Sequence, residues 1–123
     1  MGYRVLIVDD DPDIRHLIRL RLQHDGHVVE EADAGPAGLS MALDGAYDLA
    51  FIDIGLPVLD GYEIARQVRA APVKHHPCMV AVTANSDDPR VAFEAGFDCH
   101  VFKPLAPNAI TAVLEEMPRR KRG

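Results

Sequence analysis

Five short apolar runs, each followed by a polar residue or a turn, place the strongest limit on how this 123-residue chain folds. They cover residues 4–8, 27–30, 49–52, 79–82 and 100–102. Runs of this length and composition are typical of strands buried on both faces of a sheet. The segments between them carry apolar residues at helical spacing, which predicts a helix after each strand. Strands that alternate with helices predict a parallel sheet covered by helices on both faces.

Proline and glycine residues set the expected ends of the helices. The first helix begins at Pro12, in the first turn, and ends before Gly26, while the fourth ends at Gly96. The remaining helices are expected over 36–44, after Asp60-Gly61 and over 107–116. Five such units favour an α/β flavodoxin-like (βα)5 fold, a doubly wound five-stranded parallel sheet with strand order 2-1-3-4-5. We expect residues 1–117 to form this one domain and 118–123 to be a short basic C-terminal tail or the start of a linker.

Charge and composition exclude several classes of protein. The formal net charge is −6, which argues against direct nucleic-acid binding by the body of the chain. No apolar run approaches the ~20 residues of a membrane helix, and the N-terminus lacks the regions of a signal peptide. The two cysteines, Cys78 and Cys99, have no metal-ligand spacing. We therefore expect a cytoplasmic protein that does not associate with membranes.

Polar residues follow four of the predicted strands. Asp9 and Asp10 follow the first, Asp53 the third, Thr83 the fourth and Lys103 the fifth. In doubly wound sheets, ligands bind at the carboxyl ends of the strands where the winding direction reverses. For the order 2-1-3-4-5 this point lies between strands one and three, so the three aspartates are expected to converge there. The neighbouring acids Asp11 and Asp13 are expected only to cap the first helix.

Three converging carboxylates repel one another and require a cation between them or a raised pKa. Oxygen ligands of this kind suit Mg²⁺, and also Mn²⁺. A carboxylate beside such a cation can attack phosphorus and form an acyl phosphate. The phosphoryl oxygens then need neutralising partners, which an ammonium and a hydroxyl supply. Lys103 and Thr83 provide both groups at adjacent strand ends.

These residues resemble the receiver domain of two-component response regulators over residues 3–117. Residues around His100, including Gly96-Phe97-Asp98, are similar to receivers attached to hybrid sensor kinases, and stand-alone receivers are the other kind that the chain resembles. The matching segments are Val5-Leu6-Ile7-Val8-Asp9-Asp10-Asp11, Asp48-Leu49-Ala50-Phe51-Ile52-Asp53-Ile54-Gly55-Leu56-Pro57 with Asp60-Gly61, Val82-Thr83-Ala84 and Lys103-Pro104-Leu105. Each segment alone is weak, but all four at the right spacing are highly specific.

The resemblance implies a role for each acid. Asp53 is the implied phosphoacceptor, and the implied Mg²⁺ ligands are Asp10, Asp9 directly or through water, Asp53 and the backbone carbonyl of Gly55. The implied donor is a phosphohistidine on a histidine kinase or a histidine phosphotransfer protein.

The resemblance also implies how the signal is transmitted. Thr83 and Lys103 contact the phosphoryl group, and the Lys103–Pro104 peptide bond is cis. Thr83 then moves toward the phosphate, and the residue three before the lysine, here His100 rather than an aromatic, turns inward behind it. The face formed by the fourth helix, fifth strand and fifth helix changes its partner binding, and a homodimer through that face is a further expectation. Such a chain catalyses only its own phosphorylation and dephosphorylation, and is not an enzyme with a free substrate.

Two alternatives use the same residues. A Mg²⁺-dependent phosphatase of the haloacid-dehalogenase type also has an aspartate nucleophile, and Asp9-Asp10-Asp11 offers its Asp-x-Asp pattern. Asp13 stands where that family usually has Thr or Val, and the chain looks short for that fold. The second alternative is a degenerate receiver that acts only as a docking module. That function would be indicated by missing site residues, and none is missing.

Overall fold

The computed structural model describes residues 2–73, 76–84 and 87–122, and their side chains up to residue 117. Strands and helices alternate throughout, as the apolar runs predict. The elements are β1 (Arg4–Val8), α1 (Pro12–His24), β2 (Val28–Ala32), α2 (Gly35–Asp44), β3 (Leu49–Asp53), α3 (Gly61–Ala70), β4 (Cys78–Thr83), α4 (Pro89–Ala95), β5 (Cys99–Phe102) and α5 (Ala109–Arg122). None of the described helices has the length and apolar character needed to cross a membrane.

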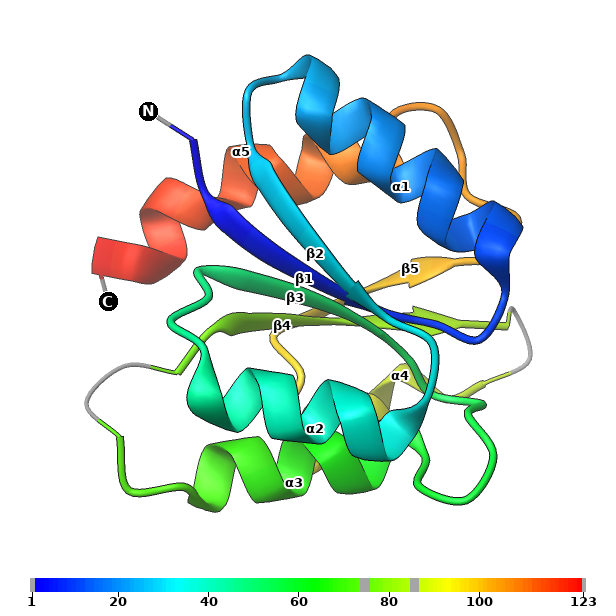
Figure 1. The fold of residues 1–123 in the computed structure, drawn as a ribbon, viewed down its shortest axis with the longest axis vertical. Coiled ribbons are helices and arrows are strands. Elements are labelled where there is room, and N and C mark those ends of the chain that lie inside the picture. The colour runs from blue at the N-terminus through cyan, green and yellow to red at the C-terminus, as the bar shows by residue number, and fades with distance from the viewer. Residues whose placement is uncertain (1, 74–75, 85–86, 123) are drawn as a thin grey trace.

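All of the strand pairs in the sheet are parallel, and the strand order is β2-β1-β3-β4-β5, which confirms the predicted topology. Helices α1 and α5 cover one face of the sheet, and α2, α3 and α4 cover the other (Figure 1). In this order β1 and β3 are neighbours, although β2 and α2 separate them in sequence. The chain therefore reverses its winding direction between β1, which Asp9 follows, and β3, which ends at Asp53.

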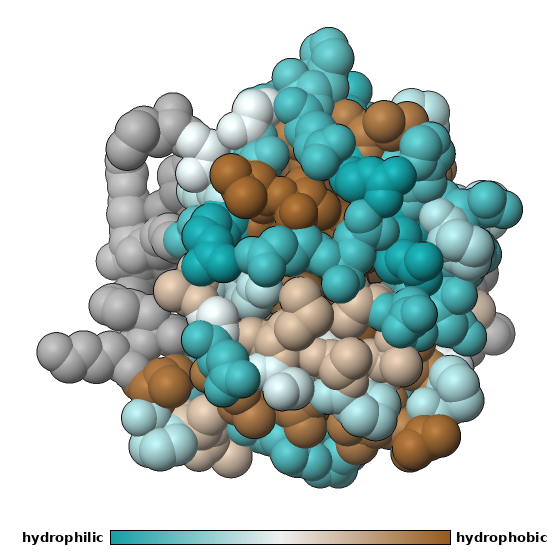
Figure 2. All heavy atoms as spheres, in the orientation of Figure 1, coloured by the Kyte–Doolittle hydropathy of each residue, from teal (hydrophilic) through white to brown (hydrophobic). Residues whose placement is uncertain are grey.

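The buried strands divide their side chains between two cores. Leu6 and Val8 of β1 pack on the side of α2 and α3, whereas Val5 and Ile7 pack on the side of α1 and α5. This alternation follows from the two-residue period of a strand, and it explains why the runs are apolar throughout rather than alternating. On the face shown in Figure 2, the surface is mostly hydrophilic over α1 and weakly hydrophobic over the Ala- and Gly-containing helix α2.

Aspartates cap three helices. The carboxylates of Asp11, Asp60 and Asp88 accept hydrogen bonds from backbone N–H groups in the first turns of α1, α3 and α4, at distances of 2.9–3.0 Å. These bonds satisfy donors that have no partner within the helix. At the other ends, Gly26 and Gly96 have φ values of 88° and 118°, the left-handed region in which glycine carries no steric cost. The capping role predicted for Asp11 is confirmed.

Two elements differ from the predicted bounds by more than one residue at an end. The second strand was expected over 27–30, but β2 continues to Ala32 because all five of its residues pair with β1, and its glutamates lie on a half-exposed edge strand. The last helix was expected to end at 116, but α5 continues to Arg122. A proline inside a helix removes one hydrogen bond and its ring crowds the carbonyl four residues earlier, but α5 continues past Pro118, and the Arg and Lys residues that follow have good helix propensity. The backbone of 118–122 is thus helical, whereas Met1 and Gly123 lie outside the described residues.

Candidate functional site

Asp9, immediately after β1, is held by backbone and side-chain contacts. Its N–H donates to the carbonyl of Ala32 at 3.1 Å, and its own carbonyl accepts from Nη1 of Arg15 at 2.7 Å. One carboxylate oxygen, Oδ1, accepts from the N–H of Asp11 at 2.9 Å. The residue is 1% exposed, and Oδ2 accepts no hydrogen bond within the described part of the chain. A buried carboxylate oxygen without a donor is expensive unless a cation compensates it.

Asp53 ends β3 and is 7% exposed. Its Oδ1 accepts from the N–H of Gly55 at 3.0 Å, and Gly55 itself is exposed. The start of α3 passes directly beside this strand end, since a Cβ on Gly61 would lie 2.6 Å from the carbonyl oxygen of Asp53. Only glycine permits that approach.

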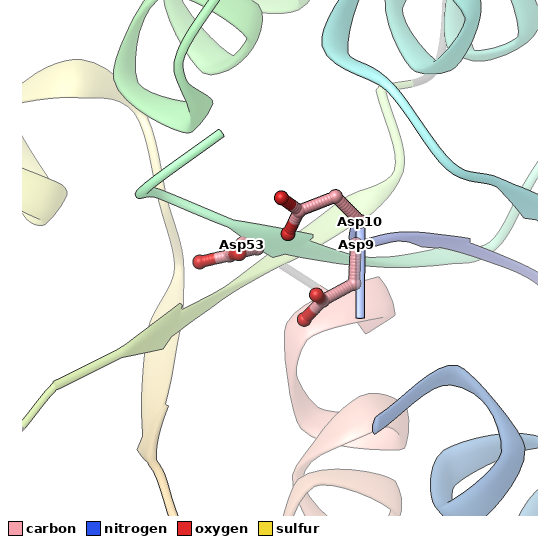
Figure 3. A group of neighbouring side chains, drawn as sticks. All are labelled: Asp9, Asp10 and Asp53. Atoms are coloured by element: carbon pink, nitrogen blue, oxygen red, sulfur yellow. The ribbon is translucent and has the colours of Figure 1, made fainter. Parts of the chain in front are cut away.

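The predicted convergence of three carboxylates is present. Asp9, Asp10 and Asp53 each offer an oxygen within 4.8 Å of the others, and all three carboxylates point to the same side of the strand ends (Figure 3). Two of the three residues are buried, and Asp10 is exposed. The purely oxygen donor set of these three carboxylates fits a hard divalent cation. The arrangement is therefore an acidic pocket able to hold a metal ion.

Lys103 brings a positive charge to the same pocket from the end of β5. Its Nζ lies 3.3 Å from Oδ2 of Asp9 and 3.3 Å from Oδ2 of Asp53. Burial lowers the pKa of the ammonium, but the charges of Asp53 and Asp9 outweigh that effect, so the pKa of Lys103 is raised above its usual 10.5. The group stays protonated at neutral pH. The Lys103–Pro104 peptide bond is cis, as the resemblance implied.

Thr83 ends β4, and His100 lies on the adjacent strand β5, where it is paired with Ala81. Thr83 is buried, and its hydroxyl donates to the carbonyl of Val101 on β5 at 3.4 Å. The backbone carbonyl of Thr83 accepts from the N–H of Lys103 at 2.8 Å, which joins the two strand ends. His100 is half-buried, and its ring meets that of Phe102 edge to face with centroids 4.8 Å apart. In this structure, therefore, the Thr83 hydroxyl is engaged with β5.

Two residues of this region were not identified from the sequence. Arg15 was treated as a polar residue of a helix, yet it holds the backbone of Asp9 and also pairs with Glu31 at 3.2 Å. Val58, in the loop between β3 and α3, has a φ of 71°. For Arg15, the only signal in the sequence was its position one turn after the acids. For Val58, the only signal was a turn-like composition, with Pro57 before it and Asp60-Gly61 after it. Neither signal identifies the contact or the residue with positive φ.

The raised pKa of the Asp9 carboxyl makes the stability of the folded chain depend on pH. Burial raises this pKa, the hydrogen bond from Asp11 lowers it, Asp53 raises it and Lys103 lowers it, with a net rise above the usual 3.8. The folded state thus keeps a proton over a pH range in which the unfolded chain has already lost it. The stability of the metal-free protein therefore falls as pH rises through that range. Relative to the native chain, Asp9→Asn is expected to gain stability as pH increases from 4 to 7. Urea unfolding with a chelator measures this, and a pH-independent difference would contradict it.

Comparison with known proteins places the chain among signalling proteins. A family model described as the response regulator receiver domain matches residues 5–115. The transcriptional regulatory protein ResD of Bacillus subtilis is 32% identical over 118 residues, which is 95% of this chain and 48% of that protein. The chain spans about half the length of the curated relatives it matches.

Solved structures share the fold. The chemotaxis response regulator CheY4 of Vibrio cholerae has a TM-score of 0.87 at 25% identity, covering 95% of this chain and 99% of that one. The receiver domain of the Saccharomyces cerevisiae response regulator Ssk1, crystallised with the histidine phosphotransfer protein Ypd1, gives 0.85 at 26% identity, covering 94% and 88%. Both similarities extend over nearly all of the sheet and its helices.

Proposed function

This chain belongs to the response regulator receiver domain family of two-component systems, and on that basis we propose that Asp53 accepts a phosphoryl group from a phosphohistidine of a partner protein. The observation that supports the proposal is the meeting of Asp53 with two further carboxylates within 4.8 Å and with Nζ of Lys103 at 3.3 Å. These groups come from three separate strand ends. A nucleophile, an acidic metal pocket and a fixed cation are the parts that phosphoryl transfer needs.

The transfer uses the residues as follows. A carboxylate oxygen of Asp53 attacks phosphorus, the P–N bond to the imidazole breaks, and the nitrogen keeps the electron pair. The ammonium of Lys103 pairs with a phosphoryl oxygen in place of the Asp53 oxygen that becomes bonded to phosphorus. The hydroxyl of Thr83 leaves the carbonyl of Val101 to donate to another phosphoryl oxygen. A bound divalent cation supplies charge neutralisation of the phosphoryl oxygens. The chain thus catalyses its own modification and has no free substrate to turn over.

The metal is proposed to be Mg²⁺, held by Asp9, Asp10, Asp53 and the carbonyl of Gly55, with Mn²⁺ as a substitute. Magnesium favours sites with one or two carboxylates, retained waters and a phosphate oxygen. An exposed acid such as Asp10 leaves room for the waters.

Mg²⁺ binding is expected to stabilise the folded chain without any phosphodonor. At 100-fold above its Kd, the melting temperature should rise by about 10 °C at pH 7. Asp10→Asn should lose most of this shift because it removes an exposed ligand carboxylate. Asp11→Asn is the matched control, since asparagine keeps the cap of α1 and Asp11 lies outside the metal group. An equal shift in the native chain and in Asp10→Asn would contradict the assignment, and differential scanning calorimetry measures it.

The output surface is proposed to be the face of α4, β5 and α5, which is also the candidate homodimer surface. Two hollows lie there, one between α4 and β5 and one between β5 and α5, and His100 lines both. Phe93 on α4 is 74% exposed at the rim of the first. Movement of Thr83 toward a phosphoryl group would free space behind it, next to β5, which gives His100 a place to turn inward.

One experiment separates the proposal from the alternatives. The chain is incubated with Mg²⁺ and radiolabelled phosphoramidate, and any acid-stable, base-labile label is mapped by proteolysis. The proposal expects stoichiometric label on Asp53. Label on Asp9 with continuous phosphate release would instead indicate a haloacid-dehalogenase-type phosphatase, and absence of label would indicate a docking module.

A further inference from the structure

Val58 adopts a backbone conformation that valine rarely takes. Its φ is 71°, the only positive value at a non-glycine residue in the described part of the chain. The N–H of Leu59 donates to the carbonyl of Pro57 at 2.8 Å, which closes a three-residue turn with Val58 at its centre. Turns of this kind with positive φ are rare and strained, and a β-branched residue adds to the strain.

The neighbours of Val58 fix this turn in place. Leu56 is buried and Leu59 packs against the core beneath α2 and α3. The carbonyl of Leu59 lies directly against the start of α2, where a Cβ on Gly35 would be 2.1 Å from its oxygen. Pro57 has a restricted φ of its own. The loop is therefore anchored on both sides of Val58, and the conformation of Val58 follows from those anchors.

The valine side chain gains nothing in the folded state. It is 97% exposed, so its methyl groups are not removed from water. A left-handed conformation favours glycine or asparagine, and either would relieve the strain at this position. Single exposed apolar residues are ordinary, but the anchors that impose a positive φ here do not explain why the residue is valine rather than glycine or asparagine. A contact with another molecule would account for an exposed valine at a position with positive φ.

The position of Val58 indicates which molecule makes this contact. It lies five residues after Asp53, in a loop that projects beyond the carboxyl ends of the strands between β3 and α3 (Figure 1). Asp53 is 7% exposed, so a protein that delivers a phosphoryl group must approach over this edge of the sheet. The exposed acid Asp60 lies two residues further along the same loop, and the exposed acid Asp10 follows the neighbouring strand β1. Val58 is thus an apolar point in a loop that also carries an exposed acid.

We propose that Val58 is an apolar anchor for the phosphohistidine-bearing partner, and that this partner presents an apolar side chain flanked by basic ones beside its histidine. The inference rests on the proposed function. The apolar contact removes the methyl groups of Val58 from water, and the basic groups complement the exposed acid Asp60. Val58 is a specificity residue for the protein donor and has no contact with a small phosphodonor, which enters the pocket without covering the loop.

The test compares two donors on one variant. Val58→Asn keeps the turn, because asparagine tolerates positive φ, and removes the apolar surface. The protein donor is whichever histidine kinase or phosphotransfer protein of the same organism phosphorylates the native chain fastest, and the small donor is phosphoramidate. We expect kcat/KM for the protein donor to fall about tenfold, with the rate from phosphoramidate changed by less than about twofold. The melting temperature of Val58→Asn should equal or exceed that of the native chain.

Val73→Asn is the matched control. Val73 also follows a proline, is 46% exposed and lies in a short turn, closed by its N–H to the carbonyl of Ala71 at 2.9 Å. It is in the loop between α3 and β4, at the opposite edge of the sheet. Neither donor should distinguish Val73→Asn from the native chain.

Other outcomes overturn the inference. An unchanged protein-donor rate in Val58→Asn excludes the anchor, and an equal fall with both donors assigns Val58 to the geometry of the pocket. A native chain that takes phosphate from neither donor overturns the proposed function itself. These results are distinguishable because the phosphoramidate rate of the native chain reports on the site alone.

Discussion

Asp53→Asn is expected to abolish covalent phosphorylation by phosphoramidate, with a fall of about 10³-fold or more, the scale seen when a nucleophile is removed. The amide is nearly the same size as the carboxylate, but its oxygen is a poor nucleophile toward phosphorus. Removal of one of three converging charges should not disturb the sheet, because the residue stays hydrogen-bonded to the N–H of Gly55 through its carbonyl oxygen. Labelling at saturating Mg²⁺, followed by mass spectrometry of the intact chain, measures the loss.

Asp44→Asn provides the control for this substitution. Asp44 is an exposed carboxylate at the end of α2, outside the metal group, so its loss changes net charge by the same amount without touching the pocket. It should be labelled at the native rate. Base-labile label that persists in Asp53→Asn at a comparable rate would place the acceptor on another residue, with Asp9 the first to examine.

Lys103→Met is expected to reduce the rate of phosphorylation by phosphoramidate about 100-fold. The ammonium lies 3.3 Å from an oxygen of Asp53 and 3.3 Å from one of Asp9, so it is in reach of a phosphoryl group on Asp53. Removal of a single preorganised charge donor from a phosphoryl or oxyanion site costs on the order of 10²–10³ in rate. Because the pKa of Lys103 is raised, its charge is present across the neutral range, and the loss should be independent of pH from 6 to 9.

Arg90→Met controls for the loss of a positive charge. Arg90 is an exposed residue of α4 that pairs with Asp88 at 3.0 Å, so its removal alters the surface and leaves the pocket intact. Its phosphorylation rate should match that of the native chain. A loss of less than about threefold in Lys103→Met would show that the ammonium does not stabilise the transferring group.

The sheet was predictable because its signals are local. The apolar residues of the runs at 4–8 and 49–52 are buried, and such runs predict central strands of a parallel sheet. The cap at Asp11 was predictable because its carboxylate accepts from an N–H only two residues further along the chain. Prediction was weaker at β2 and α5, where the bounds depend on pairing with β1 and on packing of residues such as Met117.

Within the site, too, features that follow from the strand order were predicted, and features that depend on contacts between distant segments were not. The convergence of Asp9, Asp10 and Asp53 followed from the strand order, since carboxyl ends of parallel neighbours meet at one edge. The contact between Arg15 and the carbonyl of Asp9 depends on the angle at which α1 leaves β1. The direction of the Thr83 hydroxyl depends on its neighbours on β5. No sequence pattern encodes either geometry.

The sequence by itself determined the strands, the helix caps and which polar residues follow each strand, because periodicity and capping are set by residues close together in the chain. Only the tertiary structure decided that Oδ2 of Asp9 has no hydrogen bond in the described chain, that Lys103 reaches two carboxylates, and that Val58 has positive φ. Burial, charge neighbours and loop anchoring are properties of segments that meet from distant parts of the chain. The energies of such contacts depend on distances that residue order does not contain.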